Sequence, residues 1–146
     1  MVLPRDEQRL PRHTLSQSET EAVLVQADIS TPFGLRDRAM LEILYSTGIR
    51  RAELAALELS DIDRDRKTLL IRLGKGKKDR VVPIGERALA WIDKYLAEVR
   101  PDFLRNTLQN VLFLTKTGRP LHVNHLSALV RGYVERARSE EHTSEL

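Results

Sequence analysis

The sequence predicts a mainly α-helical α+β fold with one small antiparallel β-hairpin. Apolar residues recur at helical spacing in most of the chain, most clearly between Leu126 and Val134. The spacing changes in two segments, "KTLLIRL" and "RVVPI", which are rich in β-branched and apolar residues and are joined by a glycine-lysine stretch. The expected order is therefore helices, a hairpin, and helices again.

Helix signals follow one another in the first third of the chain. Ser16 and Glu19 have the spacing of a capping box, which predicts a helix with Ser16 as its N-cap. The stretch from Asp28 to Gly34 contains a Thr-Pro pair and is expected to be a break between two helices. A second helix should follow through "LRDRAMLEILYS" and end at Gly48, because glycine readily adopts the left-handed conformation found at many helix ends.

The remaining elements surround the hairpin. A short helix should begin near Arg50 and run through "RRAELAAL" before the first strand. Pro83 predicts that its strand lies at a sheet edge or ends there. Another helix is expected from Glu86 to Val99 and is ended by Pro101; a short apolar segment with a turn at Thr117-Gly118 should precede the last helix.

The composition describes one ordinary globular domain. The chain has 146 residues, of which 41% are hydrophobic and 31% charged, and no apolar run approaches the ~20 residues of a membrane span. The start of the chain lacks the apolar stretch of a secretory signal. Cysteine is absent, which excludes disulfides and thiol chemistry. We therefore expect a cytoplasmic protein.

Three segments are expected along the chain. Residues 1–12 contain prolines and many charges without a period, and they indicate a linker or arm. Residues 13–137 form the expected domain. Residues 138–146, "RSEEHTSEL", match the translation of a common sequencing adapter, so we expect the natural sequence to end at Ala137. The alternative is a polar, frayed C-terminus.

Two basic points stand out, and the first is "TGIRRAEL". A glycine turn that leads into a helix places Arg50 at a helix N-terminus, where free N–H groups and the helix dipole favour an anion. The guanidinium adds a planar fork that binds two phosphate oxygens. The alternative is that Arg50 and Arg51 are surface arginines paired with Glu53 or Glu58.

The second basic point is the hairpin tip, "LGKGKKDR". It holds one acidic residue among four cations, namely Lys75, Lys77, Lys78 and Arg80. Such a tip is either a solvated turn or a mobile cation held beside a phosphodiester, where a lysine can donate a proton as well as charge. This local concentration, more than the net charge of +3, suggests a polyanionic partner.

No metal site is expected. The four histidines are scattered, and although His122 and His125 share a helical face, no carboxylate completes a ligand set. The three carboxylates of "DIDRDR" stand at the entry to a strand, and we interpret this segment as a turn rather than a magnesium site.

The two basic points occur together in one long segment. "TGIRRAELAALELSDIDRDRKTLLIRLGKGKKDRVVPIG" resembles the first half of the catalytic domain of the tyrosine recombinases, the phage-integrase and Xer-type family. The match begins at "LPRHTLSQSE" and "GLRDRAMLEILYSTG" and continues through "LFLTKTGRPLHVNHLSALVRGYVERA". The resemblance implies the mainly helical fold of that catalytic domain, with its small antiparallel sheet and truncated at the C-terminal side.

The resemblance also implies roles for individual residues. Arg50 would be the first catalytic arginine, Glu53 a supporting acid, and Lys75 the catalytic lysine. His122 stands where the family usually has a helix-capping serine, so we expect a weaker start of the last helix. The residues expected to bind the DNA backbone are Arg51, Lys77, Lys78 and Arg80.

The reaction implied by the resemblance is a metal-free transesterification on double-stranded DNA, which needs no cofactor because a 3′-phosphotyrosyl link conserves the bond energy. The complete protein would act as a homo-oligomer, a tetramer on DNA. The family's second motif (histidine, two residues, arginine) and its nucleophilic tyrosine have no match here, since Tyr45, Tyr95 and Tyr133 stand at other positions. We expect a fragment that is inactive alone. The alternative function is a non-catalytic DNA-binding module that occupies recombination sites.

Overall fold

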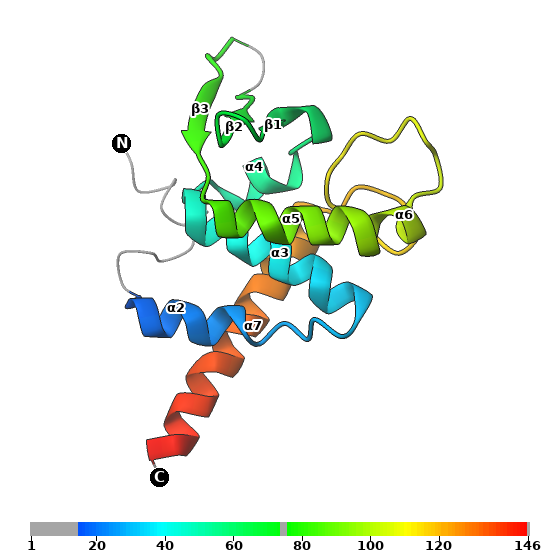
Figure 1. The fold of residues 1–146 in the computed structure, drawn as a ribbon. Helices are drawn as coiled ribbons and strands as arrows, with labels where there is room; N and C mark the ends of the chain where they lie inside the picture. Colours follow the sequence, from blue (N-terminus) through cyan, green and yellow to red (C-terminus); the bar gives the residue numbers. More distant parts are fainter. Residues whose placement is uncertain (1–14, 74–75, 146) are drawn as a thin grey trace.

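The computed structural model describes residues 15–73 and 76–145, and it has the mainly helical architecture with a small antiparallel sheet that the sequence predicts. The three-stranded sheet and the short helix α4 lie at one end of the molecule, next to the paired helices α3 and α5, and α7 extends away from them (Figure 1). The elements are α2 (Gln17–Leu24), α3 (Pro32–Thr47), α4 (Arg51–Ala55), the 3₁₀ turn η2 (Leu59–Asp61), β1 (Ile62–Asp63), β2 (Thr68–Ile71), β3 (Arg80–Pro83), α5 (Glu86–Glu98), α6 (Arg100–Phe103) and α7 (Val123–Glu145).

The first two helices begin with side-chain caps. Ser16 Oγ accepts from the Glu19 N–H and the Glu19 carboxylate accepts from the Ser16 N–H, which confirms the capping box. The expected interruption ends earlier than predicted, because Pro32 to Gly34 already belong to α3. Thr31 Oγ1 accepts from the Gly34 N–H at 3.0 Å, and Pro32 occupies the first turn, where its missing N–H costs nothing.

The sheet has the order β1-β2-β3, with both pairs antiparallel. β3 is an edge strand, which confirms the prediction from Pro83; Pro83 pairs with Thr68 at the end of the ladder. β1 was not predicted. It has only two residues, and the turn between β1 and β2 needs Lys67 at a φ of 55°, a conformation that the sequence does not announce.

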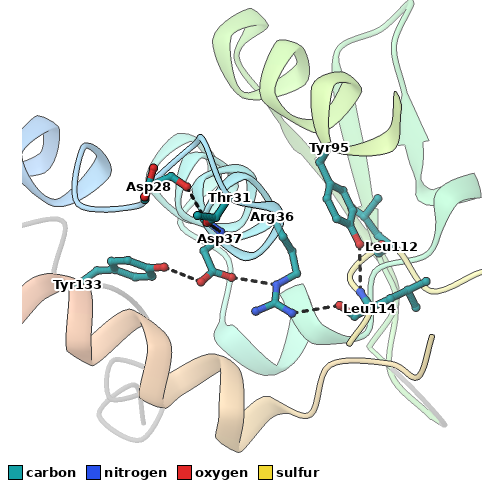
Figure 2. Close-up of polar contacts among 9 residues, drawn as sticks. Asp28, Thr31, Arg36, Asp37, Tyr95, Leu112, Leu114 and Tyr133 are labelled. Carbon is teal, nitrogen blue, oxygen red and sulfur yellow. Dashed lines mark hydrogen bonds and ion pairs between the residues drawn. The ribbon is translucent and has the colours of Figure 1, made fainter. Parts of the chain in front are cut away.

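Helix α3 is the centre of the core, and all its residues from Gly34 to Leu44 are buried. These buried residues include charged ones, and Figure 2 shows the hydrogen-bond partners of two of them, Arg36 and Asp37. Asp37 Oδ1 accepts from Arg36 Nε at 2.9 Å, and Asp37 Oδ2 accepts from the Tyr133 hydroxyl of α7 at 2.5 Å. Arg36 also donates to the Leu114 carbonyl. These bonds connect α3 to α7 and to the loop before it.

The loop between α6 and α7 lacks a long ladder and depends on side chains from the helices. The Tyr95 hydroxyl of α5 donates to the Leu112 carbonyl at 2.9 Å and accepts from the Leu114 N–H at 3.1 Å. The guanidinium of Arg100 donates to three loop carbonyls, those of Gln109, Val111 and Leu112. Pro101, which was expected to end the preceding helix, lies in the first turn of the short helix α6.

Helix α7 begins with a side-chain cap and extends beyond its apolar stripe. His122 Nδ1 accepts from the Asn124 N–H at 3.0 Å, so the imidazole takes the capping role that we expected to be weak. The helix runs past Ala137, where we expect the natural sequence to end, and continues to Glu145, because no glycine or proline interrupts it. The apolar stripe from Leu126 to Val134 packs into the core, with Leu126 fully buried.

The close contact between α3 and the preceding turn gives a test of this packing. A Cβ atom on Gly34 would lie 1.8 Å from the Asp28 carbonyl oxygen, so Gly34→Ala must displace the turn and should cost roughly 2–3 kcal/mol of unfolding free energy. The matched control is Gly132→Ala in α7, where the nearest atom is 3.6 Å away. Because glycine is a poor helix former, the control should gain about 1 kcal/mol. Urea titrations measure both, and equal effects would contradict the packing.

Candidate active site

The turn between α3 and α4 fixes the position of Arg50. Gly48 ends α3 at a φ of 70° and donates its N–H to the Leu44 carbonyl. The Thr47 hydroxyl donates to the Ile43 carbonyl at 2.7 Å and accepts from the Ile49 N–H at 3.3 Å. Ile49 is buried in the core. The backbone therefore delivers Arg50 as the extended N-cap residue of α4, at the helix N-terminus predicted from the sequence.

Glu53 lies under this helix start and joins it to the sheet. Its Oε1 accepts from the Arg50 main-chain N–H at 2.8 Å. The same carboxylate accepts two hydrogen bonds from Arg80, the first residue of β3, from Nη1 to Oε2 at 2.7 Å and from Nη2 to Oε1 at 3.0 Å. The Glu53 side chain is 9% exposed and that of Arg80 34%. A bidentate pair of this geometry is among the stronger ionic contacts in proteins.

The ion pair between Glu53 and Arg80 shifts the pKa of both side chains. Burial acts to raise the pKa of Glu53, but the hydrogen bonds from Arg80 and from the Arg50 N–H, with the charges of both arginines, outweigh it and hold the pKa below the ordinary value. The hydrogen bonds to Glu53 raise the pKa of the Arg80 guanidinium. Glu53 is therefore an anion at neutral pH and is no candidate for a proton donor.

The basic tip is carried by strands that are held at their bases. The Leu73 N–H donates to Asp79 Oδ1 at 3.2 Å where the strands separate, and at the far end of β3 the Gly85 N–H donates to Ser46 Oγ at 2.8 Å. Lys77 and Lys78 are exposed between these points. Lys75, expected to be the catalytic lysine, lies outside the described residues.

The structure thus brings Arg50, Glu53 and Arg80 together. Two of the residues expected to bind the DNA backbone, Arg80 and Arg51, have other surroundings than Lys77 and Lys78. Arg80, expected to bind the DNA backbone, is engaged by Glu53, which the sequence did not indicate because the two residues are 27 positions apart. Arg51 faces α7 instead, where a hollow of about 230 Å³ is lined by Arg51, Arg131, Val134, Glu135 and Arg138. Burial and the charge of Arg131 lower the pKa of Arg51.

The three tyrosines are poorly placed for nucleophilic attack. The hydroxyls of Tyr95 and Tyr133 are used in the buried hydrogen bonds of the core. Burial raises the pKa of Tyr95 to about 12 and that of Tyr45 to about 12, so neither readily forms a phenolate. Tyr45 Oη is itself shielded from solvent.

Among the described residues, no group of three or more His, Cys, Asp or Glu side chains lies close enough to hold a metal ion. In the same part of the chain, no helix combines the length and the apolar character that crossing a bilayer requires.

The lowered pKa of Glu53 predicts an acid-sensitive contribution to stability. A depressed pKa in the folded state stabilises the fold at pH values above the unfolded value of 4.5, and the contribution is lost as pH falls through the lower folded pKa. Unfolding free energies of wild type and Glu53→Gln should therefore differ by a constant amount above about pH 5.5 and converge toward about pH 3. A difference independent of pH would contradict the ionised pair.

Sequence comparison identifies relatives over most of the chain. Residues 13–145 match the Phage integrase family. The chain is 52% identical over 133 residues to tyrosine recombinase XerC 2 of Ralstonia nicotianae, which covers 91% of this chain and 38% of that protein. It is 40% identical over 119 residues to tyrosine recombinase XerD of Pseudomonas aeruginosa, with 82% and 39% covered. The chain thus spans about two fifths of the length of these curated relatives.

Solved structures agree with the sequence matches. XerA recombinase superposes with a TM-score of 0.72 at 27% identity, covering 84% of this chain and 41% of that one. XerH site-specific recombinase, in a post-cleavage complex with its palindromic difH substrate, superposes with a TM-score of 0.69 at 25% identity, covering 84% and 35%. With the fold, the sequence match and these structures in agreement, the chain belongs to the phage integrase family of tyrosine recombinases.

Proposed function

We propose that this chain supplies part of the active site of an enzyme that cuts and rejoins duplex DNA at specific sites. The observation that carries the proposal is the convergence of the Arg50 helix start with the foot of a basic hairpin through Glu53. The relatives of this chain are tyrosine recombinases. One of the similar solved structures, XerH, is bound to the difH substrate in a pre-cleavage and a post-cleavage complex.

In this proposal Arg50 binds the nonbridging oxygens of the scissile phosphate. Charge develops on these oxygens in the transition state, and a cation fixed at a helix N-terminus stabilises it without reorganisation. The two-pronged guanidinium also orients the phosphate for in-line attack. Glu53 holds the backbone of this helix start through the Arg50 N–H.

The hairpin has a separate role. The departing 5′-oxygen needs a proton, and a lysine at the tip, Lys75, supplies it by general acid catalysis. Lys77 and Lys78, which follow Lys75 in the sequence, are exposed and contact the DNA backbone, which contributes affinity without sequence preference. The nucleophile is a tyrosine outside this chain, because the hydroxyls of Tyr45, Tyr95 and Tyr133 are buried or used in the core. Assembly on DNA as a homo-oligomer belongs to the same proposal.

The test of this function uses two proteins and one labelled suicide duplex. The first protein is a hybrid in which residues 13–137 replace the matched segment of the XerC 2 relative, and the second is the 146-residue chain. The hybrid should form a covalent protein–DNA adduct that survives denaturing electrophoresis, and the chain should form none. An adduct with the chain alone would make one of its own tyrosines the nucleophile and would refute the assignment.

Arg50→Lys in the hybrid tests the phosphate-binding role. The change keeps the charge but loses the two-pronged contact, so cleavage should fall by ~10²-fold or more, comparable to the loss of an oxyanion donor. DNA affinity measured by fluorescence anisotropy should change little. Cleavage within a few-fold of the parent hybrid would return Arg50 to the class of surface arginines.

Lys75→Ala tests the proton donor. The variant should bind DNA normally and cleave slowly, because the 5′-alkoxide leaves without a proton. A substrate with a 5′-bridging sulfur has a leaving group that needs no proton, and it should restore the cleavage rate of Lys75→Ala to near that of the parent. Failure of the sulfur substrate to restore the rate would remove Lys75 from this role.

A further inference from the structure

The foot of the hairpin is attached to the Arg50 helix by a single buried carboxylate. Arg80 begins β3 and pairs with Ile71 of β2 across the sheet. Its guanidinium meets both oxygens of Glu53, and Glu53 Oε1 also accepts the Arg50 N–H. One side chain therefore links the start of α4 to the first residue of the strand that leaves the basic tip.

This contact leaves Arg80 poorly suited to bind a DNA phosphate. Both of its terminal nitrogens donate to Glu53, and the Glu53 side chain is only 9% exposed. Turning Arg80 toward DNA would leave a buried carboxylate without its partner cation, which is strongly unfavourable. Lys77 and Lys78, in contrast, are exposed on the tip.

A second arginine provides a comparison within the same hairpin. Arg72 follows β2 and donates to Asp61 at 2.9 Å and to the Ala56 carbonyl at 3.3 Å, at the opposite end of α4. Its side chain is 41% exposed, and its ion pairs are with Asp61 and Glu58 rather than with Glu53. The two arginines attach the two strands to the two ends of one short helix, and only Arg80 does so at the catalytic end.

We propose that Arg80 is a positioning residue, which fixes β3 against the helix start that carries Arg50 and does not bind the DNA backbone. The inference rests on the proposed function and refines it. Arg80 sets the hairpin at a defined distance from the phosphate-binding arginine, so that the tip delivers its cations to one place. The basic residues of the hairpin are thereby divided into exposed lysines that contact phosphates and one arginine that is paired within the protein.

The salt dependence of DNA binding tests the first half of the proposal with the 146-residue chain. The logarithm of the DNA-binding constant falls linearly with the logarithm of the salt concentration. Neutralising a residue that contacts a phosphate lowers the magnitude of this slope by about 0.9. Lys78→Gln should show this decrease, whereas Arg80→Gln should retain the wild-type slope. A decrease in Arg80→Gln equal to that in Lys78→Gln would overturn the proposal. Absence of DNA binding by the wild-type chain would instead refute the proposed function itself.

Cleavage by the hybrid recombinase tests the positioning half. Arg80→Gln should lower the cleavage rate measured at saturating DNA at least about tenfold, because a small misplacement of a reacting group is costly. Arg80→Lys should recover part of the rate. The 5′-sulfur substrate should rescue Arg80→Gln as it rescues Lys75→Ala, since only the proton donor has been misplaced.

The matched control is Arg72→Gln, which weakens the other strand's attachment. It should cleave both substrates at close to the parent rate. Equal losses in Arg72→Gln and Arg80→Gln, or a loss in Arg80→Gln that the sulfur substrate does not relieve, would show general loosening of the hairpin and would refute a specific role for Arg80. Circular dichroism of each variant identifies unfolding. If Arg80→Gln is unfolded, Arg80→Lys, which keeps the charge, decides between a specific positioning role and general loosening of the hairpin.

Discussion

The hydrogen bonds of the Glu53 carboxylate organise this end of the molecule. A helix N-terminus leaves N–H groups without partners, and Glu53 binds one of them, that of Arg50. The same oxygens bind the guanidinium of Arg80, so the helix start and the sheet are fixed relative to each other by one group. Because the carboxylate is nearly buried, it is held in place by both partners and remains ionised at neutral pH.

A second buried network plays the same part deeper in the core. Asp37 receives hydrogen bonds from Arg36 and from the Tyr133 hydroxyl, and Arg36 continues to the Leu114 carbonyl (Figure 2). This network fixes α7 and the preceding loop on α3, the helix whose C-terminal turn delivers Arg50. Within this network the buried charges of Arg36 and Asp37 are paired with each other, which offsets the cost of their desolvation. The rigid support of Arg50 therefore depends on polar contacts as well as on apolar packing.

Local signals in the sequence predicted most of the fold. The capping box at Ser16, the glycine at the end of α3 and the β-branched, apolar content of the two hairpin segments are signals carried by near neighbours in the sequence. Features set by distant residues could not be predicted in this way. β1 depends on pairing with β2, the Tyr133–Asp37 bond joins positions 96 apart, and the charge pair of Arg80 depends on how the sheet packs on α4. The position of Arg50 at a helix start was predictable because the glycine turn before it is a local signal.

The same distinction explains why a run of basic residues need not act as one surface. An exposed carboxylate beside the proposed phosphate-binding site would repel a polyanion. Arg80 neutralises Glu53 within the protein, so the pair contributes little net charge, and the field at the surface is left to Arg50 and the exposed lysines. The carboxylate can then order the Arg50 backbone without opposing the approach of a polyanion. Placing the compensating cation on the hairpin, rather than on α4, makes neutralisation and attachment a single contact.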